Sequence, residues 1–138
     1  MDVYLEVMIV DDDPVFRLIV GTLLKQAGIK PPHLICTNGE EALKLLEQQI
    51  SKEQMFLIFL DINMPVLDGW GVLDSLKNFP HKENIRVAMV TSSVNKADRE
   101  RALTYEQVIS YLVKPLKRED LSSLISSGSL AQFLQTNR

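Results

Sequence analysis

The chain has 138 residues, of which 46% are hydrophobic and 24% charged, a composition typical of one globular domain with its own core. The formal net charge of −3 argues against nonspecific nucleic-acid binding, and no apolar run approaches the roughly 20 residues needed to span a bilayer. A single cysteine, Cys36, excludes an internal disulfide framework, which favours the reducing cytoplasm. Together these features lead us to expect a cytoplasmic protein without a membrane or nucleic-acid partner.

The first two elements in chain order are a strand at residues 7–10 and a helix that starts at Pro14. Asp13 can cap this helix, and Gly28 can end it. Helical spacing predicts one buried face made of Phe16, Ile19, Val20, Leu23, Leu24 and Ala27. A short strand at 34–37 follows, and then a second helix, for which Asn38 and Glu41 resemble a capping box.

The later elements repeat this alternation. Residues 56–60 are apolar at every position, as expected for a strand covered on both faces. A turn at 65–68 precedes a third helix, and further strands are predicted at 87–90 and 108–113, each followed by a helix. The third helix is predicted to bury Val72, Leu73 and Leu76, and the last helix is predicted to bury Leu121, Leu124 and Ile125. Five strand–helix units in series predict an α/β domain with a parallel sheet and helices on both faces.

We expect this domain to cover residues 1–127 and a tail to cover 128–138. Leu130, Phe133 and Leu134 lie at helical spacing in the tail. They predict a segment that extends or packs beside the last helix; a partner-binding segment is the alternative.

Polar side chains that can bind metal and phosphate follow four of the five predicted strands. In an open α/β sheet the ligand site lies beyond the carboxyl ends of the strands. The residues found there are Asp11, Asp12, Asp61, Asn63, Thr91 and Lys114. Several carboxylates at one place repel each other, and a hard divalent cation relieves that repulsion. The pattern therefore predicts a Mg²⁺ site with phosphoryl chemistry, whereas Asp13 is better explained as a helix cap.

Four segments at these strand ends resemble the receiver domain of two-component response regulators. They are residues 10–12, 90–92 and 113–115 and the run Leu60-Asp61-Ile62-Asn63-Met64-Pro65-Val66-Leu67-Asp68-Gly69. The resemblance covers about residues 5–127 and keeps the order of the motifs. It implies a five-stranded flavodoxin-like sheet with strand order 2-1-3-4-5 and helices on both faces.

The resemblance also implies a role for each residue at the strand ends. Asp61 would accept a phosphoryl group from a histidine kinase or a histidine phosphotransfer protein. Mg²⁺ would be held by Asp11, Asp12, Asp61 and the main-chain carbonyl of Asn63. Thr91 and Lys114 would contact the phosphoryl oxygens, Thr91 and Tyr111 would form the switch, and the peptide bond before Pro115 would be cis.

Such a protein is not an enzyme with a separate substrate, since it catalyses only its own phosphorylation and dephosphorylation. Its output would be a protein-binding surface with an unidentified target, and a weak homodimer is a further option.

Two other functions fit parts of the sequence. Residues 11–15 satisfy the D-x-D-x-[TV] opening of haloacid-dehalogenase-type phosphohydrolases, in which Asp11 would be the nucleophile and Asp13 the general acid. The order of motifs argues against this class, because its last acidic motif should follow Lys114, whereas Asp61 precedes it. The other alternative is a receiver-shaped binding module that is never phosphorylated, although such modules usually lack one of the site residues.

Overall fold

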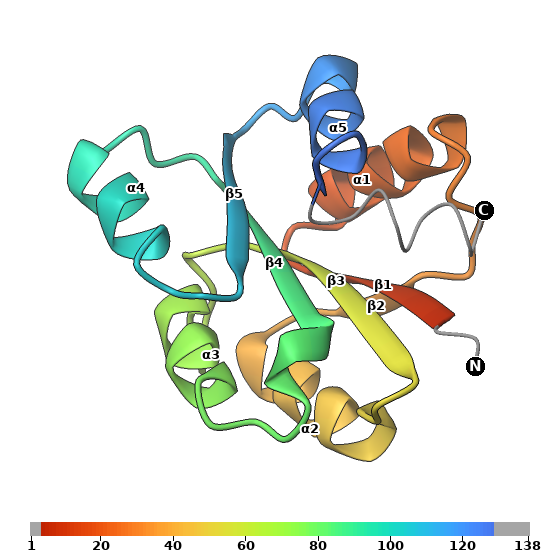
Figure 1. Ribbon diagram of the computed structural model, residues 1–138. Coiled ribbons are helices and arrows are strands. Elements are labelled where there is room, and N and C mark those ends of the chain that lie inside the picture. Colours follow the sequence, from red (N-terminus) through yellow and green to blue (C-terminus); the bar gives the residue numbers. More distant parts are fainter. Residues whose placement is uncertain (1–3, 129–138) are drawn as a thin grey trace.

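The computed structural model describes residues 4–128, which Figure 1 shows as coloured ribbons. The strands are β1 (Tyr4–Val10), β2 (Leu34–Cys36), β3 (Gln54–Leu60), β4 (Ile85–Thr91) and β5 (Val108–Val113). The helices are α1 (Pro14–Gln26), α2 (Gly39–Gln49), α3 (Gly69–Leu76), α4 (Lys96–Ala102) and α5 (Arg118–Ile125), and a short 3-10 helix, η1 (Lys82–Asn84), precedes β4. The predictions for Leu130, Phe133 and Leu134 lie outside the described residues.

All five strands are parallel and form one sheet in the order β2-β1-β3-β4-β5. This confirms the predicted α/β architecture and the flavodoxin-like strand order. Within residues 4–128, no helix has the length and apolar character that crossing a membrane requires.

Two layers of helices cover the two faces of the sheet. α1 and α5 lie on one side and α2 and α3 on the other, with α4 at the β5 edge (Figure 1). β3 supplies both cores through its period-2 alternation: Phe56, Ile58 and Leu60 enter the core under α2 and α3, whereas Leu57 and Phe59 enter the core under α1 and α5. The fully apolar run at 56–60 is therefore explained by burial on both sides.

The caps of α1 agree with the sequence, but one of its predicted core residues does not. The Asp13 carboxylate accepts the Val15 N–H at 3.0 Å, and Gly28 follows the helix with a φ of 91°. The prediction that Ile19 is buried is wrong, because its side chain is 41% exposed. α1 buries a narrower stripe, made of Phe16, Val20 and Leu24, and Ile19 lies on the flank of that stripe.

The start of α2 forms only half of the predicted capping box. The Asn38 side chain accepts the Glu41 N–H at 2.9 Å, as predicted. The Glu41 carboxylate, however, accepts a hydrogen bond from the Thr37 hydroxyl at 2.6 Å and a longer one from the Asn38 side chain. Thr37 and Asn38 thus fix the end of β2 and the start of α2, so their role is structural.

Gly69 allows α3 to start directly against the end of β3. A Cβ at this position would lie 2.5 Å from the Asp61 carbonyl oxygen and 2.8 Å from the Ile62 Cα, both of them backbone atoms. We expect Gly69→Ala to lower the free energy of unfolding by about 2 kcal/mol, because the backbone around Asp61 must shift to admit the methyl group. Chemical denaturation monitored by circular dichroism measures this loss.

Gly21→Ala is the matched control, since a Cβ at Gly21 in α1 meets nothing within 4 Å. It should raise the free energy of unfolding by about 0.5–1 kcal/mol through higher helix propensity. Equal effects of the two substitutions would contradict the close approach at Gly69.

Candidate functional site

The register of the sheet brings Asp11 and Asp61 to the same edge. Val10 pairs with Leu60, so the two aspartates directly follow paired positions of the neighbouring strands β1 and β3. The Asp61 N–H donates to the Val10 carbonyl at 3.1 Å, which extends the β1–β3 pairing by one step. Strand order reverses beside β1, with β2 on one side and β3 on the other, and open α/β sheets bind ligands at such a point.

Three carboxylates meet there. Asp11, Asp12 and Asp61 each offer an oxygen atom, and these oxygens lie within 4.8 Å of one another. Asp11 and Asp61 are buried, whereas Asp12 is exposed and faces the solvent. Asp13 is occupied as the α1 cap, as predicted, and the side chain of Asn63 is exposed.

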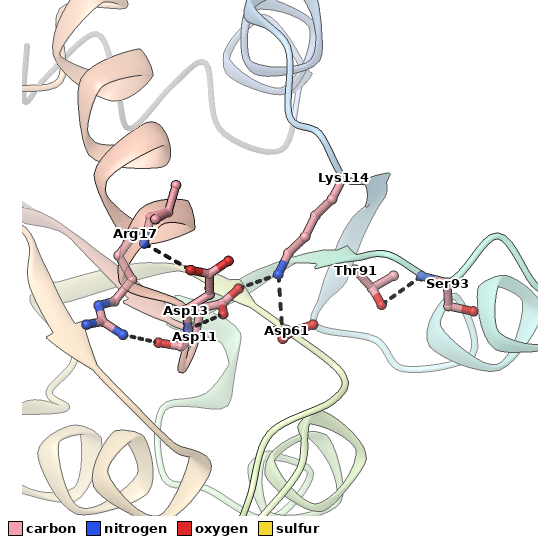
Figure 2. A network of polar contacts seen from close by, with 8 residues as sticks. Asp11, Asp13, Arg17, Asp61, Thr91, Ser93 and Lys114 are labelled. Atoms are coloured by element: carbon pink, nitrogen blue, oxygen red, sulfur yellow. Dashed lines mark hydrogen bonds and ion pairs between the residues drawn. The ribbon is translucent and has the colours of Figure 1, made fainter.

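Lys114, which directly follows the edge strand β5, extends its side chain to this cluster. Its Nζ donates to Asp11 Oδ2 at 2.8 Å and lies 3.7 Å from Asp61 Oδ2 (Figure 2). The Lys114 N–H donates to the Thr91 carbonyl at 2.8 Å, which continues the β4–β5 pairing beyond the end of β5. The peptide bond between Lys114 and Pro115 is cis, as the resemblance implied.

The environment of Asp61 disfavours its ionised form. The pKa of Asp61 is raised to about 6, first by burial and then by repulsion from the Asp11 carboxylate. The Lys114 ammonium and the backbone N–H groups of Asn63 and Ile62 lower the pKa, but they offset only part of the increase. A nearby cation would therefore stabilise the ionised form of the Asp61 carboxylate.

Thr91 and Tyr111, the two predicted switch residues, are joined through Ser93. The Thr91 hydroxyl is buried and accepts the Ser93 N–H at 3.2 Å (Figure 2). The Tyr111 hydroxyl donates to the Ser93 carbonyl at 3.1 Å, and the Ser93 hydroxyl donates to Asp98 of α4 at 2.8 Å. Ser93 thus links Thr91 to both Tyr111 and α4 through hydrogen bonds.

Two residues of α1 that sequence reasoning did not assign to the site also contact it. Arg17 donates through Nη1 to the Asp11 carbonyl at 2.7 Å, and the Phe16 ring lies beside the Lys114 ammonium. Phe16 was counted only as a core residue. Their position in the sequence could have indicated a role at the site, since both residues lie in the first turn of a helix that starts beside Asp11.

The sequence profile of the response regulator receiver domain matches residues 7–126. The chain belongs to this family, whose members are signalling domains of two-component systems. This family is a different one from the haloacid-dehalogenase-type phosphohydrolases.

Two relatives differ in how much of their length the chain matches. The chain is 29% identical over 127 residues to an uncharacterized 14.6 kDa protein of Leptolyngbya boryana, and the match covers 92% of each chain. It is 31% identical over 119 residues to the sensor histidine kinase CheAY of Helicobacter pylori, where the match covers 86% of this chain but 14% of the kinase. The chain thus spans nearly all of one relative and a small part of the other.

Solved receiver structures share the fold. The CheY-like receiver domain protein of Methanospirillum hungatei is 30% identical, with a TM-score of 0.67 and coverage of 87% of this chain and 90% of that one. The receiver domain of the Pseudomonas aeruginosa sensor histidine kinase PA1611, solved with a magnesium ion in its active-site cleft, has a TM-score of 0.69 at 23% identity, with coverage of 91% and 95%. Saccharomyces cerevisiae Ssk1, solved with the histidine phosphotransfer protein Ypd1, has a TM-score of 0.72 at 24% identity, with coverage of 91% and 87%. At these identities the last two similarities concern the fold alone.

The raised pKa of Asp61 predicts a pH-dependent cost to stability. The folded protein binds this proton more tightly than the unfolded chain, so the free energy of unfolding should fall as pH rises from about 4 to about 6 and stay reduced above that range. Asp61→Asn removes the buried charge and should stabilise the metal-free protein by on the order of 3 kcal/mol at about pH 7.5 and by under about 1 kcal/mol at about pH 4.5. Urea denaturation at the two pH values measures both differences.

Glu100→Gln is the control for this experiment, because the Glu100 side chain is 68% exposed and should change stability by less than about 0.5 kcal/mol. Destabilisation by Asp61→Asn at neutral pH would contradict the electrostatic description of the site.

Proposed function

We propose that Asp61 accepts a phosphoryl group from a phosphohistidine with the help of Mg²⁺, and that the acyl phosphate switches a protein-binding surface. The observation that carries the proposal is the meeting of three carboxylates and one ammonium at the carboxyl edge of the sheet. Structural ion pairs are normally balanced, whereas this group has an excess of two negative charges. That excess suits a divalent cation and a nucleophilic carboxylate together.

The donor set fits Mg²⁺. This ion prefers oxygen ligands in octahedral geometry and usually keeps several water or phosphate oxygens beside its carboxylate ligands. Asp11, Asp12 and Asp61 would hold it, with the main-chain carbonyl of Asn63 as a further ligand. When bound, Mg²⁺ would reduce the repulsion between the carboxylate and the incoming phosphoryl oxygens.

The side chains of the site would then carry out the transfer. A lone pair of an Asp61 carboxylate oxygen forms the new O–P bond while the P–N bond of the phosphohistidine breaks, and the departing imidazole nitrogen keeps that electron pair and takes up a proton. Lys114, whose Nζ is 3.7 Å from Asp61 Oδ2, would follow the negative charge to the phosphoryl oxygens. The Thr91 hydroxyl would donate to another of these oxygens.

Recruitment of Thr91 would bias the switch. Its hydroxyl is tied to the Ser93 N–H, and Ser93 in turn holds Tyr111 and Asp98 of α4. Because the phosphoryl group binds one arrangement of this chain of hydrogen bonds better than the other, it would shift the equilibrium between them. In this structure the Tyr111 ring is already buried, and its role in the switch stays a prediction.

A histidine kinase or a histidine phosphotransfer protein is the proposed donor, and the pairing of Ssk1 with Ypd1 in a related fold supports the second class. Phosphorylation and dephosphorylation of its own Asp61 would be the only reactions that the protein catalyses. The cytoplasmic location, the limits of the domain at residues 1–127, the downstream protein target and a weak homodimer stay predictions.

The modification itself provides the direct test. After incubation with acetyl phosphate and Mg²⁺, followed by borohydride reduction, peptide mass spectrometry should find one label, on Asp61. The label should require Mg²⁺ and disappear in Asp61→Asn, while Asp13→Asn keeps the α1 cap and should be labelled normally. Full labelling of another residue in Asp61→Asn would sink the assignment, and an unlabelled wild type would favour the binding-only module.

Metal binding separates the acidic residues at the end of β1. Asp12→Ala removes one of the three clustered carboxylates and should weaken Mg²⁺ binding at least about tenfold. Asp13→Asn should change the affinity by less than about twofold, since the Asp13 carboxylate caps α1. Calorimetric titration with Mg²⁺ measures both, and the reverse order of effects would point to Asp11 and Asp13 as the ligands.

A further inference from the structure

The Lys114 ammonium lies against an aromatic ring as well as against two carboxylates. Its Nζ is 4.3 Å from the centroid of the Phe16 ring, in addition to its contacts with Asp11 and Asp61. A cation at this distance over a ring face is attracted by the π-electron density. The ammonium therefore has three neighbours in fixed directions.

Phe16 is held firmly in place. Its side chain is only 5% exposed, and it shares its core with Leu116, which lies two residues beyond Lys114. The neighbouring residue Arg17 ties the same turn of α1 to the Asp11 carbonyl. The ring is thus fixed relative to both the end of β1 and the loop that carries Lys114.

A lysine needs such support here. Its side chain has four flexible bonds, its ammonium prefers full hydration, and the Lys114 side chain remains 21% exposed. The ring excludes water from one flank of the ammonium and disfavours rotamers that point away from the carboxylates. Fixing the Phe16 ring requires little additional free energy, because the ring is already packed in the core.

We propose that Phe16 is a positioning residue for Lys114, which sets where the ammonium meets the phosphoryl oxygens. The inference rests on the proposed function and deepens it, since Phe16 acts only through Lys114. A purely structural role is the competing explanation, because Val20 and Leu24 continue the buried stripe of α1 and are fully buried.

Nuclear magnetic resonance of the metal-free protein tests the contact without any phosphorylation. The ring current of Phe16 should shift the ε-methylene protons of Lys114 upfield, and Phe16→Leu should return them to ordinary values. Protons of Lys114 at ordinary values in the wild type would overturn the proposal.

The rate of labelling by acetyl phosphate at saturating Mg²⁺ tests the role. Phe16→Leu should slow labelling about fivefold while Mg²⁺ affinity stays the same. Because this change also removes core contacts, a second variant replaces Phe16 by trifluorophenylalanine, which keeps the ring shape and weakens its attraction for cations. It should also slow labelling, with stability close to that of the wild type.

Phe56→Leu is the matched control, since Phe56 is fully buried in the core on the other face of the sheet. It should destabilise the protein without slowing the labelling of the folded fraction. An unchanged rate in both Phe16 variants, or equal slowing in Phe56→Leu, would overturn the positioning role alone. A wild type that takes no label would overturn the proposed function and, with it, the role of Phe16.

Discussion

Repulsion between buried carboxylates is the constraint on which the rest of the site depends. The pairing of β1 with β3 fixes Asp11 and Asp61 side by side, and burial prevents water from screening them. Lys114 relieves part of this repulsion at 2.8 Å from Asp11 and 3.7 Å from Asp61, and the pKa of Asp61 still rises to about 6. Additional positive charge at this site would therefore stabilise the ionised form of Asp61.

The fold supplies the rigidity that such a site needs. Asp61 and Lys114 each directly follow a strand, and their N–H groups continue the hydrogen bonding of the sheet past the end of that strand. Two separate cores hold the sheet from both faces, and Gly69 lets α3 begin against the backbone of Asp61. A chain of hydrogen bonds runs from Thr91 through Ser93 to Tyr111 and α4, and the proposed phosphorylation would act on this chain.

Much of this arrangement was predictable because local patterns carry it. The apolar run at 56–60, the Asp13–Pro14 start of α1 and the acids after two strands each have a short-range cause that the sequence displays. The contact between Phe16 and Lys114 has none, since it joins residues far apart in the chain through the packing of α1 against the loop after β5. The burial predicted for Ile19 is wrong because of tertiary packing as well. Periodicity marks a possible buried face of a helix, but the width of that face depends on the neighbouring helix.

The most direct test of the account is the titration of the Asp61 carboxyl carbon by ¹³C nuclear magnetic resonance, without and with saturating Mg²⁺. We expect a pKa of about 6 in the metal-free protein and a marked decrease when Mg²⁺ is bound, because the cation favours the ionised carboxylate. A pKa near the ordinary aspartate value of about 3.9 that Mg²⁺ leaves unchanged would contradict it. In that case the three carboxylates would not form one coupled site.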